Sequence, residues 1–144
     1  MIEKNASKQS SGYEGGQDIR ERAFEFACRV VMLCQGLYDG GGVGRLLVAQ
    51  LLTCSGSTAT MLEEGRAAES DADFVSKCSI SLKECRESWT RLRICAKCRL
   101  GPQAEVTELV QESSELIAII STIVRNKRLK MKMIAPRRRG LLNS

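Results

Sequence analysis

Histidine is absent from this 144-residue chain. A general base that works near neutral pH is usually a histidine, and Ser–His and Cys–His nucleophile pairs require one. Di-iron four-helix bundles carry inward Glu-x-x-His motifs, which this sequence cannot form. We therefore expect a protein that is not an enzyme, and catalysis by a carboxylate, a lysine or a thiolate alone is the remaining alternative.

Proline and long apolar runs are scarce. Pro102 and Pro136 are the only prolines, so long stretches can stay helical without interruption. β-Branched and aromatic residues do not alternate with polar ones for long, which disfavours strands. No apolar run approaches the roughly 18 residues of a membrane span, and residues 1–17 lack the apolar core of a signal peptide. We expect an all-α, cytoplasmic protein with no membrane partner.

The seven cysteines are odd in number and come without a signal peptide, so we expect reduced thiols. Cys95 and Cys98 form a C-x-x-C motif. Zinc would need two further ligands from a second such pair or from histidine, and the sequence offers neither. A redox-active C-x-x-C belongs at a helix N-terminus, whereas this one lies near the predicted C-terminus of a helix. We interpret the cysteines as structural and expect no metal or other cofactor.

Apolar residues at steps of three and four predict four amphipathic helices, over about 18–38, 43–64, 68–99 and 103–128. The first is predicted to face inward through Phe24, Ala27, Val31, Cys34 and Tyr38, with Ala23, Val30 and Leu37 widening this seam on one side. The third has the most regular seam, typical of a left-handed bundle: Cys78, Leu82, Cys85, Trp89, Leu92 and Ala96. The sequence thus predicts an antiparallel up-down four-helix bundle over 18–128, between a disordered segment over 1–17 and a basic tail over 129–144.

The predicted fourth helix has a broader apolar arc than one bundle core needs. Excess apolar surface on one helix of a small protein suggests a contact between subunits. A deeply buried helix within the monomer explains the same periodicity equally well. The arc consists of Val106, Leu109, Leu116, Ile120 and Ile123, then Val110, Ile117 and Val124, and finally Ile119.

The positive charge is concentrated at the C-terminus. The net charge is +5, yet outside the last 20 residues 17 acids outnumber 14 cations. Lysine and arginine neutralise phosphates and release condensed counterions, which gives salt-sensitive binding with little sequence selectivity. The tail cations are therefore the first candidates for nucleic-acid binding, with a solvated tail that has no partner as the alternative: Arg125, Lys127, Arg128, Lys130, Lys132, Arg137, Arg138 and Arg139.

A second cationic group lies on the predicted third helix. Arg86, Arg93 and Lys97 fall at i, i+7 and i+11, almost on one line along the helix. They are candidates to extend a phosphate-binding track or to pair across a subunit boundary. A solvated flank paired with Glu87 or with acids of a neighbouring helix is the alternative.

Several blocks of sequence are similar to the bacterial four helix bundle protein family. They are Phe24-Glu-Phe-Ala, Arg45 to Leu52, Glu63-Glu-Gly-Arg-Ala-Ala-Glu-Ser70, Leu82-Lys-Glu-Cys-Arg-Glu87 and Glu115-Leu-Ile-Ala-Ile-Ile120. That family includes proteins encoded in intervening sequences of large-subunit rRNA genes and relatives of the accessory variability determinant of diversity-generating retroelements. This chain departs from the family pattern at Met61, where asparagine is usual, and at Cys78 and Cys85, where small residues are common.

The resemblance implies a homopentameric ring with a positively charged surface. For the retroelement relatives, it implies binding of a reverse transcriptase and its template RNA during mutagenic cDNA synthesis. We therefore expect a non-catalytic, oligomeric, nucleic-acid-binding accessory protein whose partners are itself, RNA or DNA, and a reverse transcriptase. The alternative is a structural or protein-interaction bundle with no specific nucleic-acid role.

Overall fold

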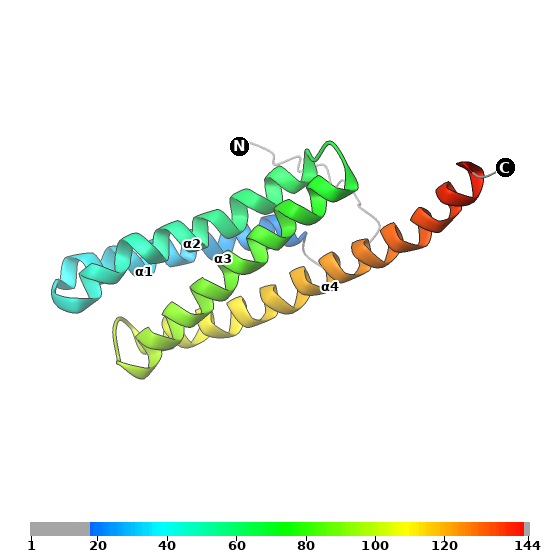
Figure 1. The fold of residues 1–144 in the computed structure, drawn as a ribbon. Coiled ribbons are helices and arrows are strands. Elements are labelled where there is room, and N and C mark those ends of the chain that lie inside the picture. The colour runs from blue at the N-terminus through cyan, green and yellow to red at the C-terminus, as the bar shows by residue number, and fades with distance from the viewer. Residues whose placement is uncertain (1–17, 143–144) are drawn as a thin grey trace, which may run out of the picture.

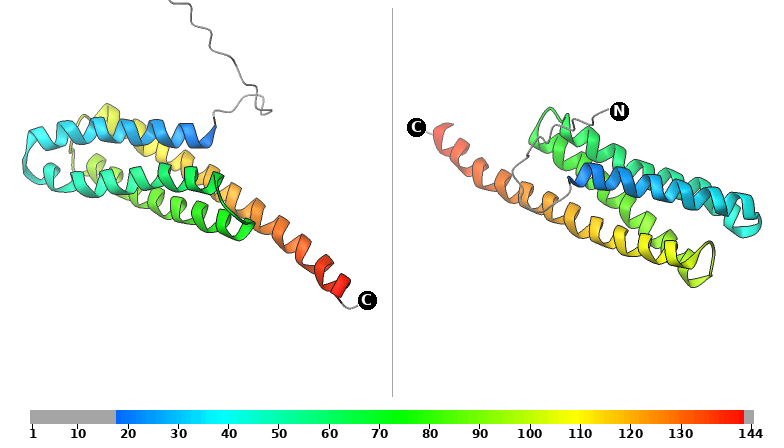
Figure 2. Two further views of the ribbon diagram at one scale, coloured as in Figure 1. Left: turned by 90° about the horizontal axis from the view of Figure 1, so that it is seen from above. Right: turned by 180° about the vertical axis from the view of Figure 1, so that it is seen from behind.

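The computed structural model describes residues 18–142, and side chains are described as far as residue 134. The predicted disordered segment 1–17 lies outside this range. Four helices follow one another: α1 (Ile19–Gly40), α2 (Gly42–Arg66), α3 (Asp71–Lys97) and α4 (Gln103–Leu142). Each packs on the next, and α4 also contacts α1, so the four enclose one interior (Figures 1 and 2). The predicted all-α bundle is confirmed, with no strand among the described residues.

Local chemistry defines the helix ends. Asp18 caps α1 by accepting a hydrogen bond from the backbone N–H of Arg20 at 2.9 Å. Ser70 does the same for α3, accepting from the N–H of Asp73 at 3.1 Å, so α3 begins slightly later than predicted. Only Gly41 separates α1 from α2, and its φ of 69° is one that glycine adopts freely.

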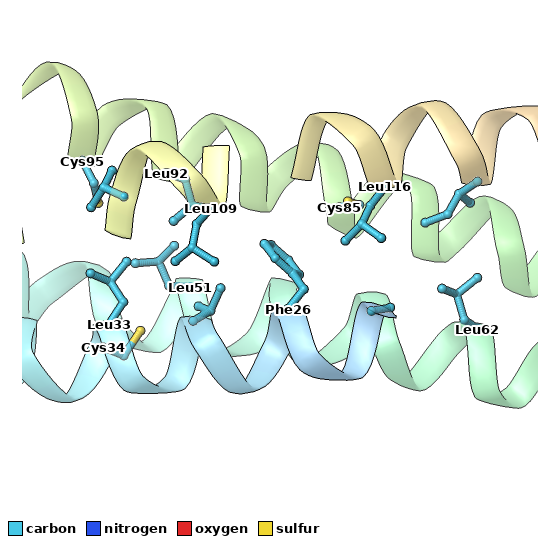
Figure 3. Close-up of a cluster of buried hydrophobic side chains, with 14 of the residues drawn as sticks. Phe26, Leu33, Cys34, Leu51, Leu62, Cys85, Leu92, Cys95, Leu109 and Leu116 are labelled. Carbon is cyan, nitrogen blue, oxygen red and sulfur yellow. The ribbon is translucent and has the colours of Figure 1, made fainter. Parts of the chain in front are cut away.

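The interior is lined with apolar side chains from all four helices (Figure 3). Figure 3 shows Phe26 and Leu33 of α1 facing Leu109 and Leu116 of α4, with Leu51 of α2 beside them. Five small hydroxyl side chains are buried among these residues. Each one donates a hydrogen bond to a backbone carbonyl, which removes the cost of burying it: Ser55, Thr58, Ser81, Ser88 and Ser113.

Serine residues also set the rotation of α3. Ser81 donates from Oγ to the carbonyl oxygen of Thr58 on α2, at 2.7 Å. Of the predicted seam, Cys78, Cys85 and Leu92 are buried, whereas the other three members are only partly buried. Ser81, Ser88 and Cys95 are also fully buried and face the core beside them.

The predicted inward face of α1 is only partly correct: Cys34 and the flanking Ala23, Val30 and Leu37 are buried, whereas the main seam is largely exposed. Phe24, Val31 and Tyr38 are 57%, 48% and 56% exposed. The helix instead buries a stripe about 100° around its axis, formed by Ala23, Phe26, Val30, Leu33, Cys34 and Leu37. Both stripes repeat every three or four residues, so periodicity alone could not choose between them. Packing of α1 against α4 as well as α2 selects the buried one.

Helix α4 uses its broad apolar arc within the chain. Val106, Leu109, Leu116, Ile120 and Val124 are buried, and its other apolar residues of the arc are partly buried. This favours the buried-helix explanation over a subunit contact on α4. The helix does not stop near residue 128 as predicted but continues to Leu142, past the ends of the other helices (Figure 1).

None of the described helices combines the length and the apolar character that crossing a bilayer requires.

The connection between α3 and α4 requires glycine at position 101. Gly101 has a φ of +78°, and a Cβ atom added there would lie 3.0 Å from Cδ1 of Leu33. We expect Gly101→Ala to lower the free energy of unfolding by about 1–2 kcal/mol, from backbone strain and the contact with α1. Gly36→Ala is the matched control, because its Cβ would meet nothing within 4 Å. The control should be neutral or stabilising by up to about 1 kcal/mol in urea titrations. Equal effects at the two positions would contradict the assignment.

Candidate nucleic-acid interface

The charges of α4 are divided along its length. Its first half carries Glu105, Glu108, Glu112 and Glu115, and cations begin at Arg125. Arg22 of α1 holds Glu112 at 2.6 Å and also pairs with Glu115, and Arg29 holds Glu108 at 2.7 Å and Glu105 at 3.2 Å. The hydrogen bond from Arg22 to Glu112 raises the pKa of that guanidinium. All four acids are thereby paired with two arginines of α1, and they face that helix and not the cations.

Four of the predicted tail cations are exposed on α4 and form no salt bridge to a described residue: Arg125, Arg128, Lys130 and Lys132. Three of them, Arg125, Arg128 and Lys132, line an open pocket of about 270 Å³. Leu82 of α3 completes this α3–α4 pocket from the other side, and no acid lines it. The pocket is a concentrated positive surface at the junction of two helices.

Lys127 differs from its neighbours. Its Nζ lies 2.8 Å from an Oδ1 oxygen of Asp71 and 5.6 Å from the centre of the Phe74 ring. The lysine thus secures α4 to the start of α3, and its charge is offset locally. The remaining predicted cations, Arg137, Arg138 and Arg139, lie on the helical backbone of α4, but their side chains lie outside what the structure describes.

The second predicted group lies on the side of α3 that faces α4. Arg128 donates to the Oγ of Ser79 at 3.5 Å, and Arg86 follows Ser79 on the same stripe of the helix. Arg86, Arg93 and Lys97 are exposed, without salt bridges to described residues. Glu87 instead pairs with Arg91 at 3.5 Å. Arg93 stacks 4.4 Å above the ring of Trp89.

Together these residues form a cationic flank, which we define as Arg86, Arg93 and Lys97 of α3 with Arg125, Arg128 and Lys132 of α4. The α3 members extend over about 16 Å and the α4 members over about 10 Å, at 1.5 Å per helical residue. Among the α3 members, Arg86 is the nearest along the helix to the pocket of the α4 members, because Leu82, one turn before it, lines that pocket. Lys97 lies at the far end of α3.

Two cations that the sequence analysis did not single out lie beside this flank. Lys83 and Arg91, together with Arg86, line an open pocket of about 620 Å³ over the outer face of α3, the α3 pocket. Lys83 could have been found from its spacing, since it is three residues before Arg86. Arg91 could not, because its place depends on a hydrogen bond to Gln50 of α2 at 3.1 Å.

The opposite side of the bundle has the opposite charge balance. An open pocket of about 590 Å³ between α1 and α2 is lined by Asp18, Glu21 and Glu63 against Arg20 and Arg66. Phe24 also lines it. The bundle therefore presents cations along α3 and α4, and an acidic pocket with apolar neighbours along α1 and α2.

The thiols are mostly enclosed. Cys34, Cys54, Cys78, Cys85 and Cys95 are buried, whereas Cys28 and Cys98 are exposed. Burial raises the pKa of Cys34 to about 11 and that of Cys85 to about 12, so both are neutral thiols near pH 7. Among residues 18–134, no cluster of three or more histidine, cysteine or acidic side chains is placed to hold a metal ion.

Thiol reactivity should follow this division. With DTNB at neutral pH, we expect two thiols per native chain to react rapidly and five to react only as fast as the protein unfolds. All seven should react at once in guanidinium chloride. More than two rapidly reacting thiols in the native protein would contradict the packing of the core.

The same burial predicts alkaline destabilisation. The folded-state pKa of Cys85 lies above the ordinary thiol value of 9.0. Its stabilising contribution is therefore complete below about pH 9 and is lost as the pH rises towards 12. Thermal melts between these pH values should show a falling midpoint, and Cys85→Ala should reduce the slope.

Comparison with known proteins places the chain in context. The model of the 23S rRNA-intervening sequence protein family matches residues 16–122. A crystal structure of a protein of unknown function, from the S23 ribosomal protein family of Bacteroides thetaiotaomicron, is similar with a TM-score of 0.68 and 25% identity. That match covers 74% of this chain and 98% of the other. No curated protein sequence matches this one.

Proposed function

Since the chain belongs to the 23S rRNA-intervening sequence protein family, we propose that it is a non-catalytic, self-associating protein that binds nucleic acid through the cationic flank. The observation that carries this proposal is the lack of acidic partners for the six flank cations among the described residues. The acids nearest in sequence on α4 pair with Arg22 and Arg29 instead. Six unneutralised cations along two adjacent helices match the repeating charge of a phosphate backbone.

The non-catalytic part of the proposal is supported by the chemistry of the side chains. The chain has no histidine. Cys34 and Cys85 are held as neutral thiols by burial. The two exposed thiols do not share an element: Cys28 lies on α1, and Cys98 is the C-cap of α3.

We propose that the protein acts in the cytoplasm and that RNA is the nucleic acid it binds. DNA is a second ligand for the same flank. The resemblance to retroelement accessory proteins supports a further step, in which the protein helps a reverse transcriptase to bind its template RNA. This step rests on the resemblance alone. Co-purification of the protein with the reverse transcriptase, dependent on RNA, is the experiment that tests it.

Salt dependence tests the cationic flank directly. We expect a single-stranded RNA to bind with an affinity that falls steeply as salt rises, because each neutralised phosphate releases counterions. In Arg128→Gln/Lys132→Gln, the slope of log K against log salt should decrease by about 0.7 for each lost contact. Trp89, the only tryptophan, lies beside Arg93 and provides a fluorescence signal along with anisotropy.

A matched control removes the same charge elsewhere. Arg66→Gln/Lys77→Gln also deletes one arginine and one lysine, but Lys77 pairs with Glu64 at 3.3 Å and Arg66 lines the α1–α2 pocket. This double variant should keep the wild-type slope. If both double variants behave alike, the binding depends on net charge and not on the flank.

The exposed apolar residues of α1 favour self-association as a companion function. Phe24, Val31 and Tyr38 lie on one line of α1, on the side that carries Arg20, whose guanidinium reaches Glu63 of α2. Leu52 of α2 is 38% exposed. We propose that this α1–α2 apolar surface packs against another copy of the chain. In this proposal each copy is an up-down antiparallel bundle, and the copies assemble as a ring. The number five comes from the family resemblance. If the protein instead only binds other proteins, this same surface would be the place where they bind.

One charge on this surface should disrupt the assembly. We expect Val31→Glu to lower the mass measured by light scattering from that of an oligomer to that of a monomer, because a carboxylate buried at an interface costs several kcal/mol. Met32→Glu is the control: it lies about 100° around the helix and is 67% exposed. A wild-type protein that is already monomeric would contradict the proposal.

A further inference from the structure

The α3 pocket combines two kinds of surface. Leu47, Leu82 and Ile94 supply apolar contacts, whereas Lys83 and Arg86 supply positive charge and form no salt bridge to a described residue. Glu87 is the one acid of the lining, and it pairs with Arg91 at 3.5 Å. Its volume of about 620 Å³ is within the range of about 300–1,000 Å³ that small-molecule sites occupy. An uncharged apolar ligand would leave the cations unused, and a bare phosphate would leave the apolar surface unused. A ligand with a flat apolar part and an anionic part uses both.

The α3 pocket and the α3–α4 pocket are neighbours. Leu82 lines both of them, and Arg86 lies one helical turn after Leu82. The α3–α4 pocket, at about 270 Å³, has three cations and is too small for a complete ligand but suitable for phosphate groups. A chain of nucleotides is a ligand that can place phosphates in one pocket and a base in the next.

We propose that the α3 pocket receives unstacked bases of a single-stranded RNA whose phosphates lie along the cationic flank. The inference rests on the proposed function and adds selectivity for single strands. In a duplex, the bases are paired and stacked, so they cannot enter a pocket on a protein surface. A single strand can turn bases outward onto this pocket, one beside Leu82 and the guanidinium plane of Arg86. Another can lie beside Ile94, about 18 Å further along α3 at 1.5 Å per helical residue.

The test separates the pocket from the flank. Ile94→Ser removes an apolar contact without changing charge, and Ile94 is 44% exposed, so the fold should survive. Ile80→Ser is the matched control, because Ile80 is on the same helix, is 40% exposed and does not line the α3 pocket. Binding of the full-length protein would be measured by anisotropy with a mixed-sequence single-stranded RNA and with a duplex of the same sequence. Thermal melts would confirm folding of both variants.

We expect Ile94→Ser to weaken binding of the single strand by about fivefold or more, as for the loss of one stacked base, and to leave duplex binding unchanged. Ile80→Ser should change neither. Loss of duplex and single-strand affinity together, or no loss of either, would overturn the pocket assignment while the salt-dependent binding to the flank stands. If neither RNA binds even in dilute salt, the proposed function fails as well.

Discussion

Burial of the apolar seam of α4 is the constraint from which the charge pattern of the molecule follows. Once Leu109, Leu116 and Ile120 are enclosed by the other helices, the rotation of α4 about its own axis is fixed. Its glutamates must then face α1, where Arg22 and Arg29 pair with them. Arg125 and Arg128 must face α3 and solvent. A single helix therefore contributes acids to one boundary of the bundle and cations to another.

This separation gives the two sides of the bundle different chemistry. Along α3 and α4, the cations of the flank lie beside small and apolar side chains and form no salt bridge to a described acid. Along α1 and α2, the acidic pocket at Glu63 lies beside the exposed ring of Phe24. Phosphate-rich ligands are attracted to the first side and repelled from the second. The second side is left free for contacts between copies, so the two proposed activities need not compete for the same surface.

The sequence was sufficient to predict the four helices, because steps of three and four persist through each of them and few residues interrupt them. Helix rotation was harder. Phe24 and Phe26 both fit a periodic stripe on α1, and only packing against α4 makes Phe26 the buried one. The predicted seam of α3 missed Ser81, because a buried serine needs a carbonyl partner, here that of Thr58, which no local pattern reveals.

The candidate interface shows the same division between local and tertiary information. Runs of lysine and arginine identify a cationic segment without any structure, but they do not distinguish Lys127, which is held by Asp71, from Arg128, which is exposed. The pairing of Arg91 with Gln50, and the junction of two pockets at Leu82, depend on contacts between helices. The most direct measurement of where nucleic acid binds is ultraviolet crosslinking of bound RNA followed by mass spectrometry of the peptides. Crosslinks on α3 between residues 82 and 97 and on α4 between residues 121 and 132 are predicted; crosslinks confined to α1 and α2 would contradict a nucleic-acid interface on the cationic flank.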